Sequence, residues 1–465
     1  MKNFRLLLSI AVCFSLLPSC KKETFTGSAD ARLRISTDSL KFDTVFTSTG
    51  SVTQSFKIVN ENEQRLRLSS IKLMGGTTSA FKININGTSA SELSNLEIAA
   101  NDSIYIFVSV TVNPSAANLP FIISDSISVQ YNGNQRWVQL QAYGQNANFL
   151  RNEVISSNST WTNDRAYVIL GSLLVAPNVT LTINPGAKIY SHADAPFVVD
   201  GTLVVNGTAT DKVTFTGDRL DEPYRNFPAS WPGIIFRSSS INNLLQFAEI
   251  RNAYQALVLL DPASNANPKL VLQQCIIDNA YNAGILSSNS SVQANNLLIS
   301  NCANNIYIEK GGNYSFTHCT VASYSSNLLL HKTPVLSIAN FVAGNPASQD
   351  LRASFTNSIF WGDNGFVENE ILVNKQGNTV FDVRFTNCLY RANSDPANST
   401  IVASMKNIDP LFDSVEVSSR IYNFRHNNQA LAPGINKGVV TSTVVDLDNH
   451  PRPVGLPDLG CYEKQ

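Results

Sequence analysis

Five short stretches decide the fold of this chain, because each repeats the same pattern of residues. Four of them read Glu249-Ile250-Arg251-Asn252-Ala253-Tyr254, Ile276-Ile277-Asp278-Asn279-Ala280-Tyr281, Leu298-Ile299-Ser300-Asn301-Cys302-Ala303 and Thr320-Val321-Ala322-Ser323-Tyr324-Ser325. Ile250, Ile277, Ile299 and Val321 hold one shared place; the last two separations are equal and the first is longer. A fifth copy, Ile338-Ala339-Asn340-Phe341, follows Phe316-Thr317-His318-Cys319 at the shorter separation. A nearly constant period of this kind is typical of a protein built from stacked repeats.

Each repeat contains short runs rich in Val, Ile, Leu and Phe, separated by Asn, Ser and Gly. Such runs are too short for helices and are typical of strands joined by turns. A unit of about 22 residues with several short strands fits one coil of a parallel β-helix. Coils of this kind stack about 4.8 Å apart. We therefore predict that Ile250, Ile277, Ile299 and Val321 form one inward column.

A recurring Asn marks one corner of the predicted coil. Asn252, Asn279 and Asn301 share this position, and Ser323 takes it in the fourth copy. Asn tolerates the left-handed backbone conformation that a sharp corner requires, and stacked amides can hydrogen-bond along the stack. We predict a structural ladder of these three residues. The alternative is that Asn is simply common in the loops of this chain.

The cysteines within the repeats are interpreted as packing residues. Cys319 and Cys388 hold matching places in Phe316-Thr317-His318-Cys319 and Phe385-Thr386-Asn387-Cys388, and a third copy has Ser358 there. A small, exchangeable residue indicates an inward position. No CxxC motif or Cys/His pair has the spacing of metal ligands, so no metal site is predicted. The spacing does not indicate disulfides.

Residues 1–20 are interpreted as a targeting segment rather than as part of the fold. A basic start precedes an apolar stretch, Leu6 to Leu17, that is too short to span a membrane as a helix. The stretch ends in Leu17-Pro18-Ser19-Cys20, which resembles a bacterial lipobox and implies that Cys20 is lipidated. The alternative is an ordinary secretory signal with a chance Cys. Residues 21–31 are interpreted as a tether, and their charged start resembles that of surface lipoproteins of Bacteroidetes-type bacteria.

This resemblance implies a location and a set of partners. The lipid would attach the protein to the outer membrane, facing the cell surface or, alternatively, the periplasm. The chain has Lys+Arg 34 against Asp+Glu 35, and no basic stripe. Because nucleic-acid binding relies on clustered positive charge, no nucleic-acid partner is expected.

Residues 32–147 lack the repeat and instead alternate apolar and polar residues, as in Ile104-Tyr105-Ile106-Phe107-Val108-Ser109-Val110. About seven such strands, punctuated by turns such as Asn132-Gly133, predict a β-sandwich. The run Leu40-Lys41-Phe42-Asp43-Thr44-Val45-Phe46, followed by Ser55-Phe56-Lys57-Ile58-Val59-Asn60, resembles the immunoglobulin-like modules of bacterial envelope proteins. Such modules often serve as spacers.

Residues 148–405 hold the repeats and, before them, Leu181-Thr182-Ile183-Asn184-Pro185-Gly186-Ala187 and Trp231-Pro232-Gly233-Ile234-Ile235-Phe236. This series resembles the first coils of right-handed parallel β-helix proteins of the pectate-lyase-like superfamily. Residues 406–465 resemble the tail that follows such helices in surface proteins. Because the last coil leaves an open sheet edge, we predict that this segment caps it. The predicted fold class is all-β: a right-handed parallel β-helix preceded by an immunoglobulin-like β-sandwich.

The sequence predicts no catalytic constellation. Polysaccharide-cleaving β-helix enzymes need charged residues on one outer face, either a basic residue with calcium-binding acids or paired carboxylates. The repeats are poor in charge, and the five His residues pair with no Ser or Cys nucleophile motif. Glu249, Arg251 and Asp278 could meet on the surface, but a solvated ion pair is the simpler interpretation.

The charged stretch from Asp218 to Trp231 is the candidate ligand-binding site. It is longer than a corner requires, and long loops often carry function. It combines the acids Asp218, Asp221 and Glu222, the bases Arg219 and Arg225, and the aromatic residues Tyr224 and Trp231. Carboxylates can hold sugar hydroxyls or calcium, and an aromatic ring can stack on a sugar. No cofactor is predicted, since calcium is chemically allowed but not indicated, and a hydrated loop explains the same residues.

Three functions follow. The first is a lipid-anchored envelope protein whose β-helix is a non-catalytic module that binds glycan or another surface ligand. The second is a polysaccharide lyase or glycoside hydrolase acting on extracellular glycan, and the third is a purely structural or adhesive surface protein. An enzyme would bring three or more charged groups together in one groove, which distinguishes it from the other two.

Overall fold

The computed structural model describes residues 24–46, 53–112, 121–363, 365–427 and 431–465. The chain divides into two compact units, Met1–Gln145 and Asn146–Gln465, and each is described by itself. The segment 406–465 belongs to the second unit. Cys20, the predicted lipidation site, lies outside the described residues. Within them, no helix is long and apolar enough to cross a membrane.

The first unit contains two sheets of short strands. One has the order β1-β5-β10-β11-β3, with β8 also paired to β5, and the other has the order β2-β4-β9-β6-β7. A one-turn helix, η1 (Gly76–Thr78), follows β5. The strands are β1 (Phe25–Thr26), β2 (Leu33–Ile35), β3 (Ser39–Phe46), β4 (Gln54–Asn60), β5 (Arg65–Leu73), β6 (Phe81–Ile85), β7 (Thr88–Ser89), β8 (Glu92–Ile98), β9 (Ser103–Val110), β10 (Phe121–Tyr131) and β11 (Asn134–Gln145).

Alternating side chains allow the two sheets to share one core. In β9, Ile104 and Ile106 are buried, whereas Tyr105 and Phe107 are exposed. Ile127 of β10, in the other sheet, belongs to the same apolar cluster as Ile104 and Ile106. This alternation is expected for strands with one face toward a core and the other toward water. The first unit is therefore all-β with a single core.

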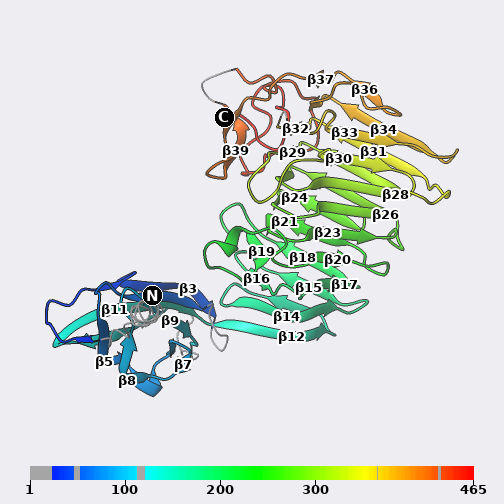
Figure 1. The fold of residues 1–465 in the computed structure, drawn as a ribbon. Coiled ribbons are helices and arrows are strands. Elements are labelled where there is room, and N and C mark those ends of the chain that lie inside the picture. Colours follow the sequence, from blue (N-terminus) through cyan, green and yellow to red (C-terminus); the bar gives the residue numbers. More distant parts are fainter. Residues whose placement is uncertain (1–23, 47–52, 113–120, 364, 428–430) are drawn as a thin grey trace, which may run out of the picture. The chain divides into compact units, whose positions relative to one another are not determined.

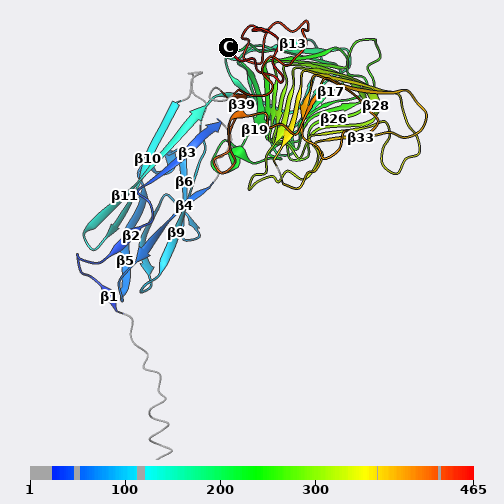
Figure 2. The same cartoon turned by 90° about the horizontal axis from the view of Figure 1, so that it is seen from above.

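The second unit is a stack of coils (Figure 1), which superimpose when seen from above (Figure 2). Its strands β12 to β37 form one 26-stranded sheet. Most strands pair in parallel with a strand of the following coil, as β15 does with β18 and β18 with β21. Most coils contribute three strands, so the stack has three faces, which we name A, B and C. This large parallel sheet is compatible with the predicted parallel β-helix.

The faces follow in chain order within each coil. The stack begins with β12 (Ala147–Ile155), β13 (Ser159–Trp161) and β14 (Ala166–Val175). Face A then holds β17 (Phe197–Val199), β20 (Ile234–Phe236), β23 (Gln255–Leu260), the first halves of β26 (Ala283–Asn295) and β28 (Asn304–Thr317), β30 (Leu336–Ala339) and β33 (Ile371–Asn374). Face B holds β15 (Thr180–Ile183), β18 (Thr202–Asn206), β21 (Asn243–Gln246), β24 (Leu270–Gln273), the second halves of β26 and β28, β31 (Leu351–Thr356), β34 (Phe381–Thr386) and β36 (Thr400–Val402). Face C holds β16 (Lys188–Ser191), β19 (Val213–Gly217), β22 (Ala248–Arg251), β25 (Ile276–Asp278), β27 (Leu298–Ser300), β29 (Thr320–Ser323), β32 (Ile359–Gly362), β35 (Leu389–Tyr390) and β37 (Met405–Lys406).

The predicted inward column is confirmed. Ile250 pairs with Ile277, Ile277 with Ile299, and Ile299 with Val321. All four side chains are buried. The assignment of Ile338 as a fifth copy in step with Phe316 is wrong, because Ile338 pairs with Ile308 on face A. The column continues instead from Val321 to Phe360.

The recurring Asn residues lie at the corner between faces C and A. Asn252, Asn279 and Asn301 have φ angles of 62°, 60° and 53°, in the left-handed region. The Asn279 amide donates to Asn252 Oδ1 at 2.7 Å. Asn301 instead donates to Asp278 Oδ1 at 3.2 Å. A hydrogen bond between side-chain amides thus joins Asn252 and Asn279, whereas the amide of Asn301 binds the carboxylate of Asp278.

The corner between faces B and C is also left-handed and is equally regular. His318, Asn357 and Asn387 have φ angles of 53°, 52° and 49°. Cys319 follows His318 and Cys388 follows Asn387, and both cysteines are free and buried. The rings before this corner stack from coil to coil, with Phe316, Phe355 and Phe385 at centroid distances of 5.3 and 5.0 Å.

The C-terminal segment lies along the side of the stack, over face C. It contains the hairpin β38 (Phe412–Glu416) and β39 (Ile421–His426), and β39 lies beside the coils in Figure 1. The amides of Asn296, Asn357 and Asn387 donate to carbonyls of this segment, each at 2.8 Å. One apolar cluster joins outward residues of face C to this segment: Ile276, Leu298, Ile359 and Leu389 with Phe412, Phe424, Leu447 and Leu459. These contacts make the segment a lateral cover of face C, in addition to the predicted cap of the last coil.

Candidate functional site

The loop predicted to bind a ligand is held together by its own charges. Arg219 donates to both carboxylate oxygens of Asp221, at 2.8 and 2.9 Å. The Arg219 guanidinium also lies 4.0 Å from the centre of the Tyr224 ring. Glu222 forms an ion pair with Arg225. The loop, which includes the one-turn helix η2 (Tyr224–Asn226), therefore satisfies most of its charges internally.

The remaining acid of this loop is also engaged. Asp218 Oδ2 lies 2.7 Å from His192 Nδ1. Burial raises the pKa of Asp218, and the hydrogen bond with His192 opposes this shift. Each of Asp218, Asp221 and Glu222 thus faces a base within the described structure. Each carboxylate of the loop that could bind calcium is therefore already paired with a base among the described residues.

Trp231 does not belong to the loop surface. Its side chain is 1% exposed and lies in the apolar core of the stack. Its indole Nε1 donates to the carbonyl of Arg251 at 2.8 Å. The expectation that this ring stacks on a sugar is corrected, because the ring fills the coil interior. Tyr224, at 44% exposed, remains accessible.

The structure brings the predicted surface charges together. Arg251 lies 3.6 Å from both Glu249 and Asp278. Lys212 also approaches Glu249, at 3.3 Å. Asp278 accepts a hydrogen bond from Ser300 at 2.7 Å as well. These residues form a mutually neutralised surface network.

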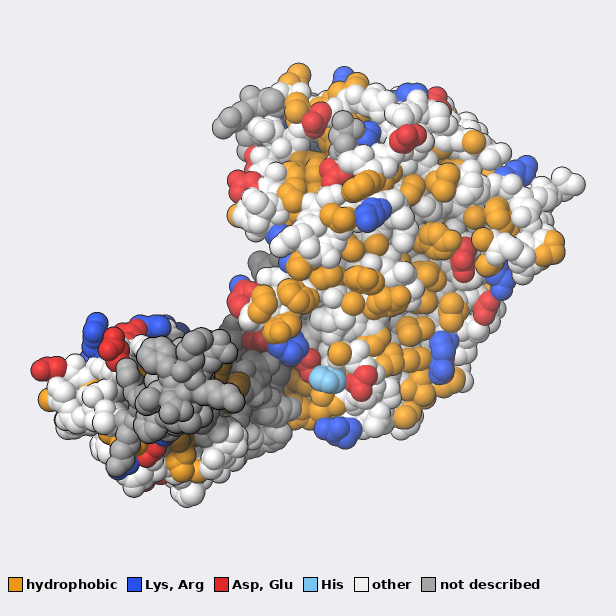
Figure 3. Space-filling view, in the orientation of Figure 1, with side chains coloured by type: hydrophobic (Ala, Val, Ile, Leu, Met, Phe, Trp, Pro, Cys, Tyr) orange, Lys and Arg blue, Asp and Glu red, His pale blue; other side chains and the backbone are white. Residues whose placement is uncertain are grey.

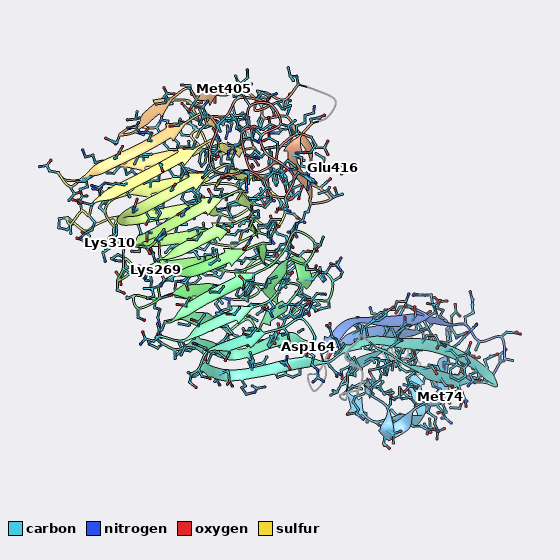
Figure 4. The ribbon with its side chains drawn as sticks, turned by 180° about the vertical axis from the view of Figure 1, so that it is seen from behind. Met74, Asp164, Lys269, Lys310, Met405 and Glu416 are labelled. Atoms are coloured by element: carbon cyan, nitrogen blue, oxygen red, sulfur yellow. The ribbon has the colours of Figure 1, made fainter. Side chains whose placement is uncertain are left out.

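A different feature offers space for a ligand: a notch at the corner between faces A and B. Residues 261–269 and 340–350 form long connections at this corner, whereas β26 and β28 cross it without interruption. The two long connections therefore stand on either side of two tight corners. The notch between them has a volume of about 430 Å³. Lys269, at the end of the connection 261–269, and Lys310, in the tight corner of β28, lie at this edge of the stack (Figure 4).

Residues with amides or hydroxyls make up half of the lining of the notch, and Pro, Ala, Val and Gly make up most of the rest. Its lining includes Asn265, Asn267, Asn289, Gln293, Asn313, Ser290, Ser291 and Ser315. Ser290 alternates along β26 with the core residues Val292 and Ala294, and its hydroxyl is closed off from solvent without a hydrogen-bond partner among the described residues. This hydroxyl therefore faces the interior of the coil, and a ligand in the notch would meet the more exposed amides and hydroxyls around it.

Two charged residues line the notch. Asp350 Oδ1 accepts a hydrogen bond from the backbone of Val380 at 3.0 Å. Arg352 is exposed on β31 and forms no ion pair within the described part of the chain. Its guanidinium can therefore donate to a ligand, whereas the carboxylate of Asp350 helps to hold its own corner.

A buried lysine fixes the wall of the notch. Lys269 is fully buried, and its ammonium donates to the carbonyls of Leu260, Arg237 and Ser238 at 2.6, 2.9 and 3.3 Å. Burial lowers the pKa of Lys269 to about 8. The three carbonyls hold the ammonium, so this residue ties the connection 261–269 to the preceding coil.

Two further polar clusters are structural. His331 Nε2 lies 3.0 Å from Glu370 Oε2, and Arg391 donates to Glu370 Oε1 at 2.7 Å. The side chains of His331 and Glu370 are 1% and 0% exposed, so a polymer cannot reach them.

The second cluster, Asp446, Asp448 and His450, has ligand atoms within 4.8 Å of one another. Asp446 already accepts the backbone N–H groups of Asp448 and His450 at 2.9 and 2.8 Å. Asp448 is paired with Arg425. These carboxylates stabilise their own turn.

Sequence reasoning missed the notch, although one signal for it was visible. Ile250 and Ile277 are further apart in sequence than Ile277 is from Ile299 or Ile299 is from Val321. The extra residues fall in the connection 261–269, which forms one wall. A comparison of corner lengths between neighbouring coils could therefore have located it.

Comparisons with known proteins identify no family. No family model and no curated protein matches the chain. Among solved structures, a family 123 glycoside hydrolase from Clostridium perfringens shares 10% identity over 27% of this chain and 26% of its own, with a TM-score of 0.18. The PapD-like domain 7 of human CEP192 shares 12% identity over 27% of this chain and 91% of its own, with a TM-score of 0.18. A protein of unknown function from Porphyromonas gingivalis shares 9% identity over 27% of this chain and 60% of its own, with a TM-score of 0.19. Similarity at this level carries no conclusion about function.

Proposed function

We propose that this is a lipid-anchored cell-envelope protein whose coils bind a glycan in the notch without cleaving it. The observation that carries the proposal is the notch itself, whose lining includes five amide side chains and the hydroxyls of Ser291 and Ser315. Glycans present many hydroxyls that both donate and accept hydrogen bonds. Amide side chains match them, because each carries two donors and an acceptor.

The charge content of the notch favours binding over catalysis. Cleavage of a polysaccharide needs an acid and a base, or two carboxylates, aimed at one bond. Only Asp350 and Arg352 are charged among the described residues that line the notch. Because Asp350 is engaged with Val380, the alternative of a lyase or hydrolase has less support.

The finer fold assignments belong to the same proposal. We take the stack to be a right-handed helix of the pectate-lyase-like kind, and the first unit to be an immunoglobulin-like spacer. The parallel pairing of β12 to β37 and the shared core of the first unit support these assignments. The outer membrane, with the notch facing outward, is the proposed location.

Glycan binding can be tested with the full chain, purified in detergent, on an array of bacterial, plant and host glycans. We expect at least one glycan to bind, and we expect Asn313→Ala and Arg352→Ala each to weaken its binding at least tenfold. Arg384→Ala is the matched control, because Arg384 is equally exposed on the neighbouring strand β34 but does not line the notch. An array without a hit, or a hit that both notch variants leave unchanged, would contradict the proposed site.

The anchor is a separate prediction. Cys20→Ala removes the thiol that a diacylglyceryl group would occupy, so the variant should leave the membrane fraction. Fractionation of cells that express either protein measures this. A variant that stays with the membrane would show that Cys20 is not the lipidation site.

A further inference from the structure

A second surface, separate from the notch, carries two exposed aromatic rings. Tyr254 and Tyr281 follow Asn252 and Asn279 at the corner between faces C and A, and they are 44% and 49% exposed. Their ring centroids are 5.8 Å apart, with planes at 25° to each other. Backbone hydrogen bonds fix the main chain that carries the rings: Tyr254 N donates to Trp231 O at 2.7 Å, and Tyr281 N donates to Ala253 O at 2.9 Å. The two rings thus form a shelf.

The core does not require these rings. The residue before each tyrosine, Ala253 or Ala280, is fully buried and fills the inward place. In the next coil Ala303 takes the position of the tyrosines, since its N–H donates to Ala280 O at 3.2 Å. The corner therefore folds equally well with a methyl group. Two adjacent tyrosines that remain half in water are consistent with a role in binding.

A row of amides runs beside the rings. Gln255 Nε2 donates to Asn282 Oδ1 at 2.9 Å, and Asn304 Nδ2 donates to Asn282 O at 2.9 Å. Gln255, Asn282 and Asn304 are partly exposed. These bonds leave Gln255 Oε1, Asn282 Nδ2 and Asn304 Oδ1 without a protein partner among the described residues. The row therefore offers acceptors and a donor next to the rings.

We propose that this shelf is a second glycan-binding site, which takes uncharged pyranose units. A pyranose has an apolar face of C–H groups and a rim of hydroxyls. The tyrosine rings can pack on the C–H groups of the sugar, and the free amide atoms can hydrogen-bond to its hydroxyls. Small-ligand sites commonly combine apolar surface with a few oriented polar groups in this way. No Lys or Arg of the described chain lies over Tyr254 or Tyr281, unlike Arg219 over Tyr224, so nothing described displaces a sugar from them.

Apolar surface continues from the shelf along face A. The outward residues there pair in register from coil to coil: Val198, Ile235 and Leu286 are partly exposed, and Val258 between them is 7% exposed. Figure 3 shows apolar side chains in rows across the coils. A chain of sugar units that leaves the tyrosines would therefore meet further apolar surface. This favours a polymer over a free monosaccharide.

The test is affinity electrophoresis of the full chain in detergent through gels that contain xylan, galactomannan, laminarin or hydroxyethylcellulose. We expect at least one gel to retard the protein and the double variant Tyr254→Ala/Tyr281→Ala to bind at least tenfold more weakly. The variant Tyr254→Phe/Tyr281→Phe keeps the rings and should retain binding. The matched control is Tyr105→Ala/Phe107→Ala, which removes a stacked pair with centroids 5.7 Å apart and both rings 42% exposed on the first unit. It should have no effect.

Three outcomes would overturn this proposal: retardation in none of the gels, equal loss with the control pair, or full binding by the double Ala variant with unchanged circular dichroism. The shelf and the notch are distinguishable. Asn313→Ala should leave retardation by the shelf intact, and the tyrosine variants should leave binding in the notch intact. Either site can therefore fail while the other stands.

Discussion

At the scale of single residues, the stack depends on positions where the backbone must turn with positive φ. At the corner between faces B and C, these positions hold Asn296, His318, Asn357 and Asn387. Asn is the natural occupant, because its short amide stabilises this conformation locally. Phe247, Gln274 and His318 depart from this preference at the same corner. His318 is fully buried against the C-terminal segment, beside Arg452.

His318 makes the stability of the protein dependent on pH. Burial and the neighbouring Arg452 charge lower the pKa of His318 from 6.5 to about 3. Between these values the unfolded chain binds a proton that the native chain does not bind, so stability falls as the pH drops through 6.5 toward 3. Each pH unit in this window costs up to about 1.4 kcal/mol. His318→Asn, which installs the residue found in neighbouring coils, should remove this loss.

Urea unfolding at pH 7.5 and pH 5 measures the effect. The native protein should lose about 2 kcal/mol more than His318→Asn between the two pH values. The lowered pKa of His426 and the raised pKa of Glu463 act in both proteins and cancel in the comparison. His450→Asn, at an exposed side chain, is the control. Identical losses in the native protein and His318→Asn would contradict the assignment.

At the scale of elements, the connections rather than the strands differ between coils. Strand pairing keeps each face in register, whereas the connection between faces A and B ranges from an uninterrupted strand in β26 and β28 to residues 340–350. This variation creates the notch. It also leaves long connections that need their own anchors, because strand pairing does not reach them.

Lys269 is such an anchor, and we expect Lys269→Met to loosen the wall of the notch. The substitution keeps the apolar stem but leaves the carbonyls of Leu260, Arg237 and Ser238 without their donor. Each buried carbonyl without a partner costs about 1–3 kcal/mol. Hydrogen exchange should accelerate in residues 261–269 and remain unchanged in residues 340–350. Equal exchange in both connections, relative to the native protein, would show that Lys269 does not hold the wall.

At the scale of the whole molecule, the second unit depends on contacts between segments far apart in the chain. The C-terminal segment covers outward apolar residues of face C, including Ile276, Leu298 and Leu389. Without it, these side chains would meet water, at a cost of about 25 cal/mol per Å² of apolar surface. The segment is therefore part of the fold rather than an appendage.

Termination of the chain after Asn407 should expose face C and distinguish a lateral cover from an end cap. We expect binding of the dye ANS to increase and hydrogen exchange to accelerate in β25, β27 and β29, which lie in the middle of the stack. A segment that only capped the end would protect β36 and β37 instead. Acceleration restricted to those last strands would rule out the lateral cover.

The sequence by itself determined the period, the inward column and the left-handed corners. These features are local, because strand alternation and the preference of Asn for positive φ act within a few residues, and the repeat shows them several times. In the sequence, alternation gives way to the repeat near residue 148, and the structure divides into its two units after Gln145.

Only the tertiary structure decided the notch, the shelf, the burial of Trp231 and the place of the C-terminal segment. Each depends on which residues of neighbouring coils lie side by side, and that depends on the lengths of connections over several coils. The assignment of a fifth repeat failed for the same reason. Ile338 lies one period after Phe316 in the sequence, but it lies on face A, whereas Phe316 lies on face B. A period in sequence specifies the pattern within one coil, whereas the surface of the stack arises from the packing of unequal coils against one another.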